Sequence, residues 1–163
     1  MRRILFVFIS AVFSLALGAY SALADSPHFL SANSSVSSST GALTVSFKEA
    51  GLGTTVSSEL ITLHVNNATA LYQCFNNGGN HPKAGNKETV STSLTTSGTF
   101  PVRNGQTTGS LTVGPPGPGS FACPSGQTLF LTSVTYTGIF VSGAGASRQA
   151  SPDPISTGPI LIG

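Results

Sequence analysis

The pattern that most constrains the fold is a period of two in the apolar residues, repeated between short breaks of Gly, Asn, Pro and Ser. Such alternation places apolar and polar side chains on opposite faces of an extended strand, and the spacing of an amphipathic helix is absent. Strands are predicted at 42–49, 57–66, 68–75, 88–95, 98–103, 107–113 and 127–142. Asn66-Asn67 is either a turn signal between two of these runs or a bend within one continuous strand. Short strands separated by turn signals are typical of a two-sheet sandwich. We therefore expect an all-β fold, a single immunoglobulin-like two-sheet β-sandwich.

The alternation also predicts which side chains enter the core. Inward-facing positions are expected at Leu43, Val45, Phe47, Ile61, Leu63, Val65, Ala68, Ala70, Tyr72, Cys74, Val90, Thr92, Leu94, Phe100, Val102, Thr107, Gly109, Leu111 and Val113. Asn104-Gly105 lies between two strand-like runs and is a strong signal for a tight hairpin. Residues 114–119, GPPGPG, lack three ladder donors, so a loop is expected there.

The first 24 residues have the organisation of a secretory signal peptide. Arg2 and Arg3 precede an apolar run over 4–17, and Ala22-Leu23-Ala24 places small residues before a cleavage site. The competing interpretation, a membrane helix, needs about 20 uninterrupted apolar residues. We expect the mature chain to be secreted to the extracellular space, without a membrane span.

Charge and length limit the partners and the domain organisation. Without Arg2 and Arg3, five basic residues remain against five acidic ones. A neutral chain lacks the basic surface that binds nucleic acid or anionic membranes, so neither partner is expected. After the signal peptide at 1–24, we expect a loose N-terminal segment at 25–41 and a β-sandwich domain at 42–142. The remaining residues, 143–163, are predicted to be a flexible tail or an edge segment.

Cys74 and Cys123 are the only cysteines of the chain. An even pair in an exported protein predicts a disulfide. A metal site would need His or acidic ligands at short spacing, and only His81 comes near Cys74. We therefore expect one disulfide, no metal and no other cofactor.

The stretch 72–86, YQCFNNGGNHPKAGN, concentrates polar residues directly after Cys74. One interpretation is a simple connection, since Asn and Gly tolerate the positive φ of turns. The other is a binding loop that presents amide, imidazole and ammonium groups to sugar hydroxyls or a peptide backbone. Its candidate residues are Phe75, Asn76, Asn77, Asn80, His81, Lys83 and Asn86. The lack of Trp and of an evident aromatic row argues against sugar binding.

No motif in the sequence indicates a reaction. No serine occupies a G-x-S-x-G elbow, and the acidic residues show no glycosidase-like pair. Glu49 and Glu88 lie at strand ends, where exposed charges are expected. His28, His64 and His81 are expected at the surface, with a His64–His81 metal site as the less favoured interpretation. We expect that the protein is not an enzyme.

Several motifs between residues 40 and 142 carry a resemblance to known proteins. They are Phe47-Lys-Glu-Ala-Gly-Leu-Gly53, Tyr72-Gln-Cys74 leading to Asn77-Gly-Gly79, Asn104-Gly-Gln106, Cys123-Pro-Ser-Gly-Gln127 and Val134-Thr-Tyr136. In combination they resemble a family of small exported bacterial β-sandwich proteins that are mostly uncharacterised. A looser likeness is to the immunoglobulin-like enediyne apoproteins, but their second disulfide is lacking here. The resemblance implies an exported bacterial protein and no particular activity.

Together these observations predict an exported non-enzymatic β-sandwich protein. It is expected to act by loop-mediated binding or as an extracellular structural component, with an extracellular glycan or protein as partner. A carbohydrate-binding or cell-wall-associated module is the alternative, and a small hydrolase is the third hypothesis.

Overall fold

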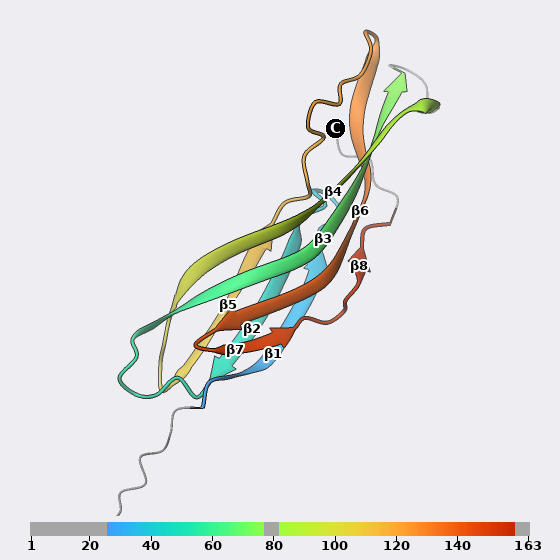
Figure 1. Cartoon of the computed structure of the whole chain (residues 1–163). Coiled ribbons are helices and arrows are strands. Elements are labelled where there is room, and N and C mark those ends of the chain that lie inside the picture. The colour runs from blue at the N-terminus through green and yellow to red at the C-terminus, as the bar shows by residue number, and fades with distance from the viewer. Residues whose placement is uncertain (1–25, 77–81, 159–163) are drawn as a thin grey trace, which may run out of the picture.

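Figure 1 shows the computed structural model of the chain, which describes residues 26–76 and 82–158. The regular elements are β1 (His28–Val36), β2 (Leu43–Ala50), β3 (Ser58–Asn76), β4 (Pro82–Pro101), β5 (Gln106–Val113), β6 (Gln127–Gly143), β7 (Ala146–Gln149) and β8 (Ile155–Ser156). The predicted all-β fold is confirmed. Within the described residues, no helix is long and apolar enough to cross a membrane.

The strands form two antiparallel sheets that pack against each other. Sheet A has the order β1-β2-β5, and sheet B has the order β4-β3-β6-β7, with β8 also paired to β6. The inward residues of both sheets form one core, and its fully buried members include Leu43, Val45, Ile61, Leu63, Val134, Tyr136, Ile139 and Val141. The predicted two-sheet β-sandwich is thus confirmed, together with most of the expected inward positions, although Thr92 of β4 is exposed.

Strand β3 is one continuous strand, which agrees with the alternative of a bend at Asn66-Asn67. The two runs on either side of Asn66 form one strand, because a bulge lies between the Val65–Leu94 pair and the Ala68–Thr92 pair and the ladder continues beyond it. Strand β4 likewise merges two predicted runs. As a result sheet B extends well past the end of sheet A (Figure 1).

Regular structure begins earlier than expected at the N-terminal side. The segment 25–41, expected to be loose, contains β1. In 143–158, β7 is the edge strand of sheet B and β8 pairs with β6, which agrees with the edge-segment alternative. A bulge between Phe29 and Ser31 interrupts the alternation in β1, and the inward Ala32 is small. The apolar alternation of this strand is therefore weak. Its backbone hydrogen bonds to β2 stabilise it as a strand.

The chain after β7 joins the two sheets along one edge. Ser151 donates its backbone N–H to the Ala32 carbonyl at 3.0 Å and accepts from the Ser34 N–H at 3.0 Å. On β7, the Arg148 guanidinium donates to the Phe29 carbonyl at 3.0 Å. The outer edge of β1 is thus covered, whereas β4 pairs only with β3 among the described residues.

The hairpin turn predicted at Asn104-Gly105 is confirmed, but β4 and β5 do not pair beyond the Arg103–Gln106 bridge, because β4 belongs to sheet B and β5 to sheet A. Asn104 and Gly105 have φ values of 52° and 69°, the positive values that a type I′ turn requires at both central positions. Arg103 and Gln106 exchange backbone hydrogen bonds of 2.8 and 3.0 Å across it. The turn carries the chain from sheet B to sheet A.

The predicted disulfide between Cys74 and Cys123 is also confirmed, with 5.6 Å between the two Cα atoms. Cys123 lies in the connection from β5 to β6, whose Pro116 carbonyl accepts a 2.6 Å hydrogen bond from the Tyr72 hydroxyl. Tyr72 and Cys74 both face inward on β3. The bridge therefore holds this connection over the part of sheet B that sheet A does not cover.

Candidate functional site

Only part of the expected binding loop lies within the described residues. Asn77, Asn80 and His81 lie outside them, and so does the side chain of Lys83, a residue of β4. The less favoured prediction of a metal site at His64 and His81 also involves a residue, His81, outside the described ranges. Phe75, Asn76 and Asn86 remain to be placed.

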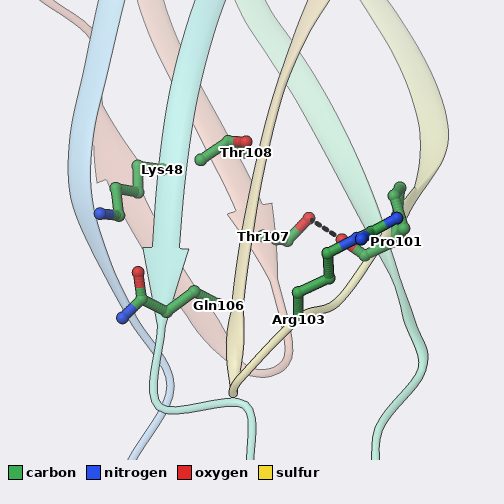
Figure 2. Close-up of a pocket in the computed structure, with 6 residues that line it drawn as sticks. All are labelled: Lys48, Pro101, Arg103, Gln106, Thr107 and Thr108. Carbon is green, nitrogen blue, oxygen red and sulfur yellow. Dashed lines mark hydrogen bonds between the residues drawn. The ribbon is translucent and has the colours of Figure 1, made fainter.

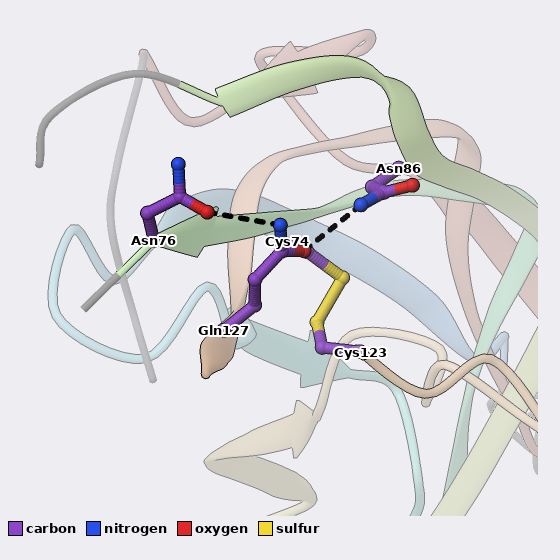
Figure 3. Close-up of a disulfide and its surroundings, with 5 residues drawn as sticks. All are labelled: Cys74, Asn76, Asn86, Cys123 and Gln127. Carbon is purple, nitrogen blue, oxygen red and sulfur yellow. Dashed lines mark hydrogen bonds between the residues drawn. A yellow bond between two sulfur atoms is a disulfide. The ribbon is translucent and has the colours of Figure 1, made fainter. Parts of the chain in front are cut away.

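Asn76 and Asn86 join Gln127 in a chain of amides beside the disulfide (Figure 3). The Gln127 Nε2 donates to the Asn76 Oδ1 at 2.9 Å, and the Asn86 Nδ2 donates to the Gln127 Oε1 at 2.9 Å. These bonds connect the ends of β3, β4 and β6. The amides thus hold the extended end of sheet B together, a role that needs the β3–β6 register and could not be predicted from the sequence.

Phe75 lies on the opposite, outer face of sheet B. It makes an edge-to-face contact with Phe130, with ring centroids 5.3 Å apart, and both rings are half-buried. Phe75 is placed beside Phe130 because β3 pairs with β6. Phe75, expected in the binding loop, is therefore one of two aromatic rings that pack together on the outer face of sheet B.

A second aromatic pair lies on the same outer face, nearer the middle of the sheet. The His64 and Phe140 rings stack with centroids 4.6 Å apart and an interplanar angle of 11°. The His64 Nε2 also lies 3.0 Å from the Ser142 Oγ. The sequence correctly placed His64 on the non-core face, but Phe140 was missed because apolar residues occur on both faces of its run.

A depression of about 330 Å³ adjoins Phe140, within the size range of small-molecule sites. Its walls are Asn66, Gly138, Ile139, Phe140, Ser147 and Gln149. The bulge of β3 explains the hollow, because it places Asn66 over Gly138, whose φ is 65°. A Cβ on Gly138 would lie 2.5 Å from the Asn66 Nδ2, so only glycine fits there.

Asp153 fixes one wall of this depression. Its carboxylate accepts the backbone N–H groups of Gly138 and Ile139 at 3.0 and 2.8 Å and the Gln149 Nε2 at 2.9 Å. The sequence pattern had placed Asp153 in a mobile end. The carboxylate instead orients the Gln149 amide, and a pattern of strands gives no signal for such a contact.

The rest of the outer face is covered by hydroxyl groups. Six consecutive outward positions of β4 are Thr89, Ser91, Ser93, Thr95, Ser97 and Thr99. Two of them bond across to β3, as the 2.9 Å contacts Thr62–Ser97 and Thr69–Ser91 show. Among the sheet B strand residues with described side chains, Lys87 is the one outward residue with a formal charge. Apart from Lys87 and the Asp153 carboxylate bound to Gln149, the described surface is polar and uncharged.

The His64–Ser142 contact and a depression beside Lys48 and Arg103 do not form functional sites. The His64–Ser142 contact resembles part of a hydrolytic triad, but no described residue bonds to the His64 Nδ1, as an orienting acid would. A depression of about 270 Å³ contains Lys48 and Arg103. Figure 2 shows Lys48 on one side of β5 and Arg103 on the other, so the two cations do not converge on one ligand.

The described residues contain no group of three or more His, Cys, Asp or Glu side chains arranged to hold a metal ion. Comparison with known proteins gives no relative: no protein-family model, no curated protein and no solved structure matches the chain. A function for this chain is therefore inferred from the chemistry of its surface.

Proposed function

We propose that the protein is an extracellular glycan-binding module, and that the outer face of sheet B is its binding surface. The depression beside Phe140 carries this proposal. An aromatic ring, two side-chain amides and a hydroxyl line it together. Small-molecule sites typically combine apolar walls with a few polar groups that fix orientation.

The chemistry of this depression suits a sugar ring. A sugar presents C–H groups on its flat faces, and these pack on the electron-rich face of an aromatic ring such as Phe140. Its rim of hydroxyl groups both donates and accepts hydrogen bonds, which matches the amides of Asn66 and Gln149. A flat apolar contact with polar groups at its rim distinguishes sugars from purely apolar ligands.

The second aromatic pair extends the surface along the sheet. From His64 to Phe75, β3 covers roughly 36 Å at about 3.3 Å per residue, and both ends carry aromatic rings on the same face. Hydroxyl groups fill the space between them. This length fits an extended polysaccharide strand better than a single free sugar.

The charge of the surface indicates a neutral ligand. With Lys87 as the one outward charge on the described strand positions, the surface offers little attraction to acidic polymers. Retention on a neutral polysaccharide should therefore change little between low and high salt. Affinity electrophoresis at both salt levels measures this, and a steep loss at high salt would point to an acidic ligand instead.

The expected location supports the same proposal. The signal peptide predicted at 1–24 and the Cys74–Cys123 disulfide suit an oxidising compartment outside the cytosol. Loop-mediated recognition of a protein is the second hypothesis, and it depends on Asn77, Asn80 and His81.

The substitution Phe140→Ala tests the proposal. The protein is passed over insoluble cellulose, chitin, xylan and mannan, and its affinity is then measured on the polysaccharide that retains it. We expect Phe140→Ala to weaken binding about tenfold, which corresponds to about 1.4 kcal/mol, because the stacking surface is lost. Circular dichroism of the variant checks that the fold is kept.

Leu30→Ala is the matched control. Leu30 is 46% exposed on β1 of sheet A, so its loss removes a similar apolar surface on the other sheet. Its affinity should equal that of the unmodified chain. No retention on any neutral polysaccharide, or equal affinity of the Phe140→Ala variant, would refute the proposal.

A further inference from the structure

Glu49 breaks the pattern of its own strand. Leu43, Val45 and Phe47 alternate inward on β2, and the next inward position is a glutamate. Its side chain is 0% exposed, and neither carboxyl oxygen has a hydrogen-bond partner. The expectation of an exposed charge at this strand end was therefore wrong. A buried carboxyl without a partner strongly favours its neutral form.

A second carboxyl faces Glu49 from the opposite sheet. Glu59 on β3 accepts the Ala144 N–H at 2.8 Å. Gly143 lies beside both acids: a Cβ built on it would lie 3.2 Å from the Glu49 Oε2 and 3.4 Å from the Glu59 Oε1. The two carboxyls therefore meet where β6 turns into β7.

The other elements around Glu49 provide no cation that pairs with it. On β5, its cross-strand partner Thr107 is uncharged and donates to the Pro101 carbonyl at 3.0 Å. On β1, the exposed His28 ring lies 2.8 Å from the Ser26 carbonyl. On β7, Arg148 donates to a backbone carbonyl of β1. Residues 143–146 of the turn itself include no titratable side chain.

We propose that Glu49 is a proton-operated switch: while Glu49 is neutral the β6–β7 turn stays closed over it, and loss of the proton loosens that turn. Ionisation would place a negative charge in the core beside Glu59, and such a charge is stable only if water reaches it. The shortest route for water is the turn, because Ala144 and Gly145 are exposed and Gly143 contributes no side chain to close it.

The switch should operate close to neutral pH. Burial, the largest cause, and the neighbouring Glu59 together raise the pKa of Glu49 from 4.5 to about 7, against the opposing effect of His28. Because this folded-state pKa lies above the usual value of 4.5, the folded protein binds the proton more tightly than the unfolded chain. The stabilising contribution is therefore complete below about pH 4.5 and is lost as the pH rises through about 7.

A cation held between the two acids is the competing explanation for the pair. The structure favours the proton, because no group of three or more metal-binding side chains occurs in the described part of the chain. Calcium is therefore included in the test as a separate addition.

Nuclear magnetic resonance tests the switch directly. The Glu49 carboxyl shift gives its pKa, and hydrogen exchange gives the protection factor of the Ala144 amide at about pH 6 and about pH 8. We expect protection to fall about tenfold, since the protonated fraction falls from about nine-tenths to about one-tenth. The amide of Gln106, in the β4–β5 hairpin, should keep its protection factor.

Two variants complete the test. Glu49→Gln should keep Ala144 protected at both pH values, and Glu59→Gln should move the Glu49 titration to lower pH by removing the repelling charge. The proposal fails if Glu49 titrates near 4.5 or if Ala144 protection is equal at both pH values. It also fails if calcium restores protection at about pH 8. None of these measurements depends on glycan binding.

Discussion

Replacing both Cys74 and Cys123 with alanine is expected to lower the free energy of unfolding by about 4 kcal/mol. The two residues are separated by 49 positions. In the chain-entropy model, a bridge that closes a loop of this length lowers the conformational entropy of the unfolded chain and so stabilises the folded state by about 4 kcal/mol. For a chain of this size the melting temperature should fall by about 10 to 15 °C. Differential scanning calorimetry measures both quantities.

The loss should be specific to the bridge. Ser125→Ala changes an exposed residue of the same β5–β6 connection and should leave the melting temperature within about 1 °C. The cysteine variant should also lose hydrogen-exchange protection first at the Phe121 amide, which donates to the Pro118 carbonyl at 3.1 Å in the same connection. A double variant that melts at the same temperature as the unmodified chain would contradict this account.

The second large effect is expected from Gly109→Ala. A Cβ at this position of β5 would lie 2.3 Å from the Phe100 Cε1 and 3.1 Å from the Phe47 Cζ. These two rings pack edge to face with centroids 4.9 Å apart, so the methyl group would separate them. We expect a destabilisation of about 3 kcal/mol, at the upper end for overpacked cores, measured by urea unfolding.

Gly114→Ala is the control for that measurement. Gly114 has nothing within 4 Å of the added Cβ, so the alanine should be neutral or stabilise by up to about 1 kcal/mol through the unfolded chain. Equal unfolding curves for the two variants would show that the Phe100 ring can shift away from the added methyl group without loss of stability. That result would contradict the tight packing of Phe100 against Gly109 and Phe47.

Local sequence patterns predict much of this fold because the relevant physics is local. Alternation assigned Val45 and Ile61 to the core, and Asn104-Gly105 placed a hairpin, since positive φ at two adjacent residues strongly limits residue choice. Two cysteines in a chain with a predicted signal peptide were enough to predict the bridge. These features follow from the residues themselves.

The candidate site depends on contacts that no local pattern contains. His64 stacks on Phe140 only because β3 and β6, far apart in sequence, pair in one register. The depression needs the bulge at Asn66, which the sequence presents as a turn signal. Glu49 is buried because the strand alternation continues by one more residue into the space between the sheets. Predicting these positions requires the sheet order as well as the strands.

The row of hydroxyl groups on β4 has a consequence for how this protein can change over evolutionary time. Inward positions such as Leu94 and Phe100 pack against the core, whereas outward positions such as Ser93 and Thr95 are exposed on an edge strand. Exposed substitutions usually alter stability by about 0.5 kcal/mol or less. A lineage could therefore alter what this face binds one side chain at a time, while selection on the alternate residues keeps the sandwich intact.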